Sequence, residues 1–167
     1  RPTAPSDDKL REYCSNDEFN SLFTITTLSD MHVAGIVSKG LSEDFVSRDI
    51  EDSFKRLFAW LKKSKPTKEI KAVMGITLDT PEVVSLSECR YFACVPADET
   101  FRPEGEISVR TFPSKGNYIS FSLERIRPDF AEVFFKITSR YPDNRPFIEI
   151  YRQSGPKMII SFYVPIR

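Results

Sequence analysis

One carboxylate near the end of the chain stands where it could bind a cation. Glu149 lies in the strand-like segment 145–151, among β-branched and aromatic residues. Because successive side chains of a strand point to opposite faces, Glu149 shares its face with Phe147 and Tyr151, and the isoleucines between them take the other face. An acid held between aromatic rings attracts a flat or cationic organic molecule. The alternative is that this face is solvated and Glu149 is an ordinary exposed strand residue.

The other chemistry-bearing residues do not suggest a catalytic or metal-binding set. His32 is the one histidine, and the cysteines Cys14, Cys89 and Cys94 have no C-x-x-C spacing, so neither a zinc site nor a disulfide framework is expected. The sequence has no recognisable nucleophile with a base beside it and no phosphate-binding glycine loop. We therefore predict no catalytic residue, no metal and no cofactor.

Composition excludes several classes of protein. With 167 residues, of which 40% are apolar, the chain is long enough for one well-buried core. Its 24 basic residues balance 24 acidic ones, which argues against direct binding of nucleic acid and against DNA mimicry. No apolar run approaches the roughly 20 residues that cross a bilayer, and no signal segment is evident, so we expect a soluble, cytoplasmic protein with reduced thiols and no membrane partner. The start at Arg1 rather than Met predicts a piece of a longer protein.

The elements that must position the acid follow from the spacing of apolar and turn-forming residues. Alternating runs rich in β-branched residues predict strands, and apolar residues that recur every three or four positions predict two helices. Pro66 ends the first helix and Pro128 opens the second. The predicted order is a strand at 22–28 paired through a Ser29–Asp30 turn with a strand at 31–37, a helix at 50–61, strands at 70–78 and 90–95, a strand at 107–112 paired with one at 118–123, a helix at 128–137, and strands at 146–153 and 157–164.

The second half of this pattern repeats the first. Each half reads strand, strand, helix, strand, strand, which predicts a duplicated unit. The expected fold is α+β, with two ββαββ-like units related by pseudo-twofold symmetry, an antiparallel sheet, helices on one face of the sheet and a central ligand groove. Residues 1–21 are polar and hold two prolines, so we expect a linker or arm there and one domain over residues 22–167.

Several short motifs follow one another in a characteristic order. They are Phe58-Ala59-Trp60-Leu61 in the first helix, Leu78-Asp79-Thr80-Pro81, the strand Arg90-Tyr91-Phe92-Ala93-Cys94-Val95, and in the second unit Glu149-Ile150-Tyr151 and Tyr163-Val164-Pro165-Ile166. In this order and spacing they resemble the GyrI-like family, the small-molecule-binding domain found C-terminal in many AraC-type and MerR-type (BmrR-like) transcription regulators. The resemblance covers residues 22–167.

The resemblance implies a binding site on the concave face of the sheet. Glu149 would lie at the base of an aromatic pocket, with Tyr151 beside it. Further candidate walls of the pocket are Phe147, Trp60, Tyr91 and Tyr118. Trp60 could instead pack at the rim of the pocket, and Tyr118 could instead be an exposed aromatic residue of its strand. The expected function is that of a non-catalytic, ligand-sensing domain of a bacterial transcription regulator, whose effector is a small aromatic or cationic molecule. DNA would be contacted only through a domain outside this chain, and a homodimer stays open.

Two other functions remain open at this point. Some members of the family are hydrolases in which the same glutamate activates water, and another member is a protein-interaction module that binds gyrase. This chain also departs from the family at residues 122–128, where many members have a histidine-glycine pair. The charges of Glu124, Arg125 and Arg127 in that stretch could admit zwitterionic or anionic ligands, or could form a solvated rim.

Overall fold

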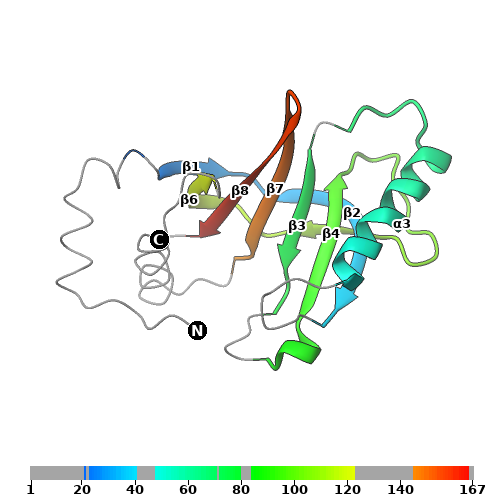
Figure 1. Ribbon diagram of the computed structural model, residues 1–167, viewed down its shortest axis with the longest axis horizontal. Helices are drawn as coiled ribbons and strands as arrows, with labels where there is room; N and C mark the ends of the chain where they lie inside the picture. The colour runs from blue at the N-terminus through cyan, green and yellow to red at the C-terminus, as the bar shows by residue number, and fades with distance from the viewer. Residues whose placement is uncertain are drawn as a thin grey trace.

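An antiparallel sheet with helix α3 against one face dominates the computed structural model (Figure 1), which describes residues 21, 23–40, 48–70, 72–79, 84–122 and 145–165. Over these residues the sheet has eight strands in the order β1-β6-β8-β7-β3-β4-β2-β5. The strands are β1 (Thr24–Leu28), β2 (Met31–Lys39), β3 (Val73–Thr77), β4 (Arg90–Pro96), β5 (Ser108–Phe112), β6 (Gly116–Ser122), β7 (Phe147–Ser154) and β8 (Lys157–Pro165), and the helices are α3 (Arg48–Ser64) and the 3-10 helix η1 (Leu86–Glu88). The predicted α+β class and antiparallel sheet are confirmed.

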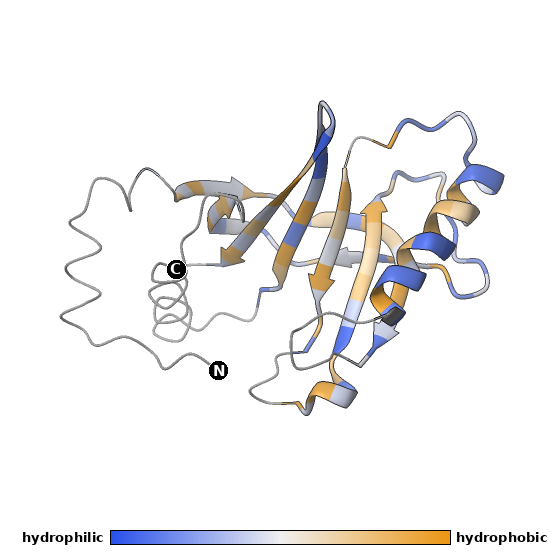
Figure 2. Cartoon of the chain, viewed as in Figure 1, coloured by the Kyte–Doolittle hydropathy of each residue, from blue (hydrophilic) through white to orange (hydrophobic). Residues whose placement is uncertain are grey.

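Helix α3 forms where the sequence separates an apolar side from a charged one. Leu57 and Leu61 are buried against the sheet, and charged residues cover the outward side, as the coloring of Figure 2 makes visible. Acidic residues in the first turn and Lys62 and Lys63 in the last turn complement the helix dipole. The helix predicted at 50–61 is confirmed and extends beyond that range at both ends.

Apolar side chains fill both faces of the sheet. The core between the sheet and α3 includes Ala34, Ile36 and Val95. The core on the opposite face contains the buried residues Val33, Met74, Ile76, Phe92, Cys94, Tyr118, Ile148 and Ile150. Since Ile148 and Ile150 belong to this second core, the predicted alternation along β7 is confirmed, and Glu149 lies on the face that α3 covers.

The two hairpins predicted within 22–37 and 107–123 are wrong. Strand β1 pairs with β6, and β2 pairs with β4 and β5. A two-residue hairpin turn requires left-handed backbone at one or both of its central residues, which Gly and Asn supply and Ser29–Asp30 does not. The two connections instead bind each other: the Ser114 hydroxyl donates to the Ser29 carbonyl at 2.7 Å, and the Lys115 amide donates to Asp30 Oδ1 at 3.1 Å.

The strands predicted at 70–78 and 90–95, and those at 146–153 and 157–164, form two antiparallel pairs. Strand β3 pairs with β4, and β7 pairs with β8 through a turn at Gly155, whose φ is 60°. At the centre of the sheet β3 pairs with β7, so the first half of the chain meets the second there. If β1 to β4 are exchanged with β5 to β8, the same strand order results, read from the opposite edge of the sheet. A duplicated unit would produce this symmetry. The helix predicted at 128–137, the charges at 124–127 and nearly all of the predicted arm lie outside the described residues, and the duplication stays a prediction.

In the part of the chain that the structure describes, no helix is long and apolar enough to span a membrane.

Candidate functional site

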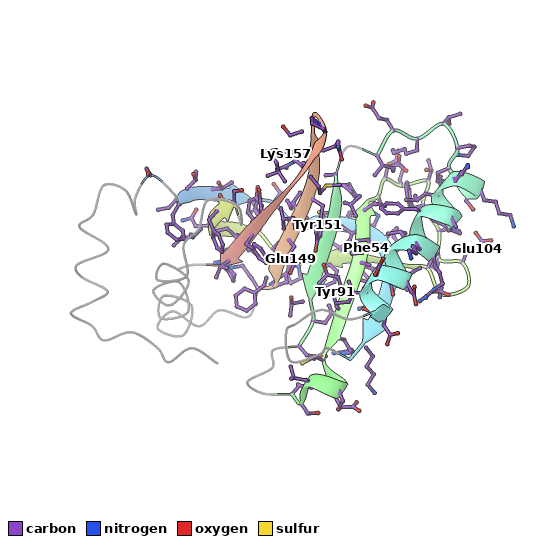
Figure 3. All side chains as sticks on the ribbon, viewed as in Figure 1. Phe54, Tyr91, Glu104, Glu149, Tyr151 and Lys157 are labelled. Carbon is purple, nitrogen blue, oxygen red and sulfur yellow. The ribbon has the colours of Figure 1, made fainter. Side chains whose placement is uncertain are left out.

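Two strands, β7 and β4, bring a small polar cluster together under α3 (Figure 3). On β7, Glu149 and Tyr151 lie two residues apart and therefore on the same face of the sheet. Glu149 stands opposite Gly75 of the neighbouring strand β3. Tyr91 comes from β4, on the far side of β3, where it stands opposite Thr77. The side chain of Tyr91 must therefore cross β3 to reach Glu149.

Both tyrosine hydroxyls donate to the same carboxylate oxygen. The distance from Glu149 Oε2 is 2.6 Å to Tyr151 Oη and 2.8 Å to Tyr91 Oη. The two phenol oxygens are 3.3 Å apart. Each phenol has a single hydrogen, so both hydrogens are used on Oε2. No described residue donates a hydrogen bond to Oε1, and none pairs with Glu149 as a cation. We call Tyr91, Glu149 and Tyr151 the tyrosine-glutamate cluster.

Burial keeps the two phenols in their donor form. Tyr91 is 5% exposed, and Tyr151 and Glu149 are half-buried. Removal from water, and next the nearby Glu149 carboxylate, raise the pKa of Tyr91 and the pKa of Tyr151 above the ordinary tyrosine range. Both hydroxyls therefore stay protonated at neutral pH. The cluster holds a carboxylate, whose free oxygen can meet a cation or a hydrogen-bond donor.

Helix α3 adds an aromatic wall to the cluster. The Phe54 ring meets Tyr91 edge-on at a centroid distance of 6.3 Å and Tyr151 at 5.7 Å. Phe58, one turn further along, stacks on Phe54 at 6.3 Å and is 44% exposed. Aromatic surface thus leads from the tyrosine-glutamate cluster to solvent. Phe54 was not among the residues predicted for the site, because its position over Glu149 depends on how α3 packs on the sheet.

Asp79 and Arg90, which belong to two of the sequence motifs, bind each other next to the cluster. Arg90 Nε donates to Asp79 Oδ2 at 2.8 Å, and the Arg90 backbone amide donates to the same oxygen at 3.0 Å. These hydrogen bonds tie the start of β4 to the end of β3 just before Tyr91. The guanidinium group of Arg90 also lowers the pKa of Asp79.

The structure brings together three of the six side chains predicted for the site, Glu149, Tyr91 and Tyr151. Phe147 lies on the same face of β7, opposite Thr77.

Trp60 and Tyr118 have other partners. Trp60 Nε1 donates to Glu104 Oε2 at 3.0 Å, beside a surface cleft of about 310 Å³ that is also lined by Arg56 and Glu106. Tyr118 is fully buried in the core on the opposite face of the sheet, and its hydroxyl donates to the Pro146 carbonyl at 3.1 Å. A strand aromatic can face either side of a sheet, so alternation alone did not place Tyr118 relative to Glu149.

The chain matches a known protein family over most of its length. The family model Cass2, described as integron-associated effector binding protein, matches residues 24–166. No match was found among curated protein sequences.

Solved structures share the fold at low sequence identity. SAV2435 bound to tetraphenylphosphonium matches with a TM-score of 0.57 and 14% identity, over 87% of this chain and 93% of that chain. The C-terminal domain of EcmrR matches with a TM-score of 0.62 and 9% identity, over 87% and 96%. A hydrolase from Listeria innocua matches with a TM-score of 0.57 and 9% identity, over 87% and 92%. The predicted GyrI-like resemblance is thereby confirmed.

Proposed function

We propose that this chain, which belongs to the family of integron-associated effector binding proteins, binds a small hydrophobic organic cation at Glu149. The observation that carries the proposal is the hydrogen bonding of the Glu149 carboxylate. Two phenols orient it through Oε2, and in the described residues neither a cation nor a donor occupies Oε1. A half-buried carboxylate of this kind gains most from a ligand that brings a positive charge.

The surroundings of the carboxylate favour a cation over an anion. Tyr91 and Tyr151 have used their only hydrogens on Glu149, so their oxygens present lone pairs to a ligand. The rings of Phe54 and Phe58 add π surfaces that attract positive charge. An anionic group at this place would meet oxygen lone pairs and a carboxylate, with no described donor to receive it.

Proteins of the same fold support this ligand class and a regulatory role. SAV2435 is bound to tetraphenylphosphonium, a hydrophobic cation. EcmrR carries this fold as its C-terminal domain, and EcmrR also forms a complex with DNA. The proposed role is therefore that of the ligand-sensing part of a transcription regulator, with DNA contacted by another domain. Ligand binding regulates only if the two states of the regulator bind the ligand with different affinity.

Tetraphenylphosphonium is the probe that tests the proposed ligand class. Isothermal titration calorimetry should detect its binding to the wild-type chain. Glu149→Gln keeps the shape of the side chain and removes its charge, so it should weaken binding by at least about tenfold, or roughly 1.4 kcal/mol.

The matched control is Glu104→Gln, which removes the carboxylate that accepts from Trp60, away from Glu149 in Figure 3. This variant should bind within about twofold of wild type, a difference under 0.5 kcal/mol. Failure of the wild type to bind, or unchanged binding by Glu149→Gln, would refute the proposal.

Hydrolysis is the second candidate function, because a protein of this fold is a hydrolase. In that role Glu149 would take a proton from water through its free oxygen. A cationic aryl ester distinguishes the two functions. It is incubated with the protein, and chromatography then measures how much of the ester remains intact. Recovery of intact ester that had bound the protein favours a sensor, whereas turnover that is lost in Glu149→Gln favours a hydrolase.

A further inference from the structure

We infer that Gly75 is a positioning residue that lets the Tyr91 hydroxyl cross strand β3 to the Glu149 carboxylate. The effect of Gly75 on ligand binding rests on the proposed function. The effect of Gly75 on the tyrosine-glutamate cluster does not.

Small residues occupy the row of the sheet that holds Glu149. Across the strands this row reads Ala93 on β4, Gly75 on β3 and Glu149 on β7. Residues that stand opposite each other in a sheet point to the same face, so the row lies under α3. The sheet therefore forms a shallow floor beside Glu149, because Ala93 has a small side chain and Gly75 has none.

Tyr91 fills the space above that floor. It begins one row away, opposite Thr77, and runs diagonally over Gly75 to reach Glu149 at 2.8 Å. A Cβ atom added at residue 75 would occupy the same space as Oη and Cζ of Tyr91, and it would lie 3.0 Å from Cε1. The end of the Tyr91 ring thus rests directly on the backbone of Gly75.

Residue 75 is a glycine because a side chain has no space there, and not because of its backbone conformation. The described glycines with positive φ are Gly40, Gly105, Gly116 and Gly155. Gly75 is not among them, so an alanine there would meet no intrinsic backbone strain. The overlap at Gly75 is with one side chain only. A Cβ at Gly35, by contrast, would overlap the backbone of Ala93 and Cys94.

A side chain at residue 75 would force Tyr91 away from the carboxylate. Backbone lies below the ring, and Phe54 packs against it from α3. The added Cβ would push the Tyr91 hydroxyl off the Gly75 backbone, toward the side of the sheet on which a ligand would approach Glu149. Glu149 would keep the hydrogen bond from Tyr151 and lose that from Tyr91. The displaced hydroxyl would obstruct a cation at Glu149, and the carboxylate would be less firmly oriented without its second donor. The lost contacts would also lower stability.

A double-mutant cycle isolates this role. Gly75→Ala is combined with Tyr91→Leu, which keeps the stem of the side chain and removes the atoms that overlap the added Cβ. Tetraphenylphosphonium affinity and the thermal unfolding midpoint are measured for wild type, both single variants and the double variant. Gly75→Ala should weaken binding by at least about tenfold in the wild-type background and by less than about twofold in the Tyr91→Leu background.

The ligand-free arm of the cycle separates this inference from the proposed function. If wild type binds no cation, the proposed function fails, and the unfolding midpoints still decide the role of Gly75. The midpoint loss caused by Gly75→Ala should shrink when Tyr91 is Leu, and if Gly75→Ala alone does not fold, Tyr91→Leu should restore folding. Gly35→Ala is the control, because its overlap with backbone should lower the midpoint equally in both backgrounds. Equal losses from Gly75→Ala in the two backgrounds would overturn the inference.

Discussion

Among single side chains, the unusual feature is one carboxylate oxygen that accepts from two phenols. Tyr151 shares a strand with Glu149, whereas Tyr91 reaches it from two strands away. The sequence predicted Glu149 and Tyr151 as neighbours from alternation along one strand. It named Tyr91 as a candidate wall, but the contact itself depends on the pairing of β3 with β4 and β7 and on the space above Gly75. Sequence alone does not fix that pairing.

The raised pKa of Tyr91 and of Tyr151 predicts a loss of stability at alkaline pH. In the unfolded chain both phenols titrate near the ordinary tyrosine pKa of about 10, whereas in the folded chain they stay protonated above that pH. Above pH ~10 the folded state therefore binds more protons than the unfolded state, and the free energy of unfolding falls as pH rises. Below pH ~10 the contribution is fully present.

Urea unfolding between about pH 8 and pH 11 measures this effect. The wild-type free energy of unfolding should fall more steeply above pH ~10 than that of the double variant Tyr91→Phe and Tyr151→Phe, by up to about 1.4 kcal/mol per pH unit for each phenol. Identical slopes for the two proteins would mean that these phenols ionise alike in the folded and unfolded chains.

Among the helices and strands, α3 carries a core residue and an exposed aromatic residue side by side. Leu57 is fully buried in the core between α3 and the sheet, and Phe58 is 44% exposed and stacks on Phe54. The helix was predictable because its apolar residues recur at helical spacing. The sequence did not predict which aromatic residues of the helix face Glu149, because that depends on the angle and position at which the helix packs on the sheet.

Two alanine variants test this division within α3. Leu57→Ala should lower the free energy of unfolding by about 3 kcal/mol, because it leaves a cavity in a packed core. Phe58→Ala should lower it by less than about 1 kcal/mol and should weaken tetraphenylphosphonium binding several-fold through lost aromatic contact. Urea unfolding and calorimetry measure the two quantities. Unchanged ligand affinity in Phe58→Ala would exclude this residue from the binding surface.

For the molecule as a whole, the strands were predictable and part of their pairing was not. Local hairpins such as β7–β8 follow from the turn residues between their strands. The pairs β1–β6 and β3–β7 join segments distant in sequence, so no local turn specifies them. The strands predicted at 22–28 and 31–37 were expected to pair with each other. Instead, β1 pairs with β6 and β2 pairs with β5. The β3–β7 pair joins the two halves at the centre of the sheet and places β3 directly beside Glu149, with β4 next to β3.

Selection of charge by Glu149 is tested most directly by a cation and a neutral molecule of similar shape. Calorimetry should compare tetraphenylphosphonium with uncharged triphenylphosphine oxide on wild type and on Glu149→Gln. We predict that wild type prefers the cation by at least about tenfold, or 1.4 kcal/mol, and that this preference disappears in Glu149→Gln. Equal affinities in wild type, or the same preference in both proteins, would contradict a cation site at this carboxylate.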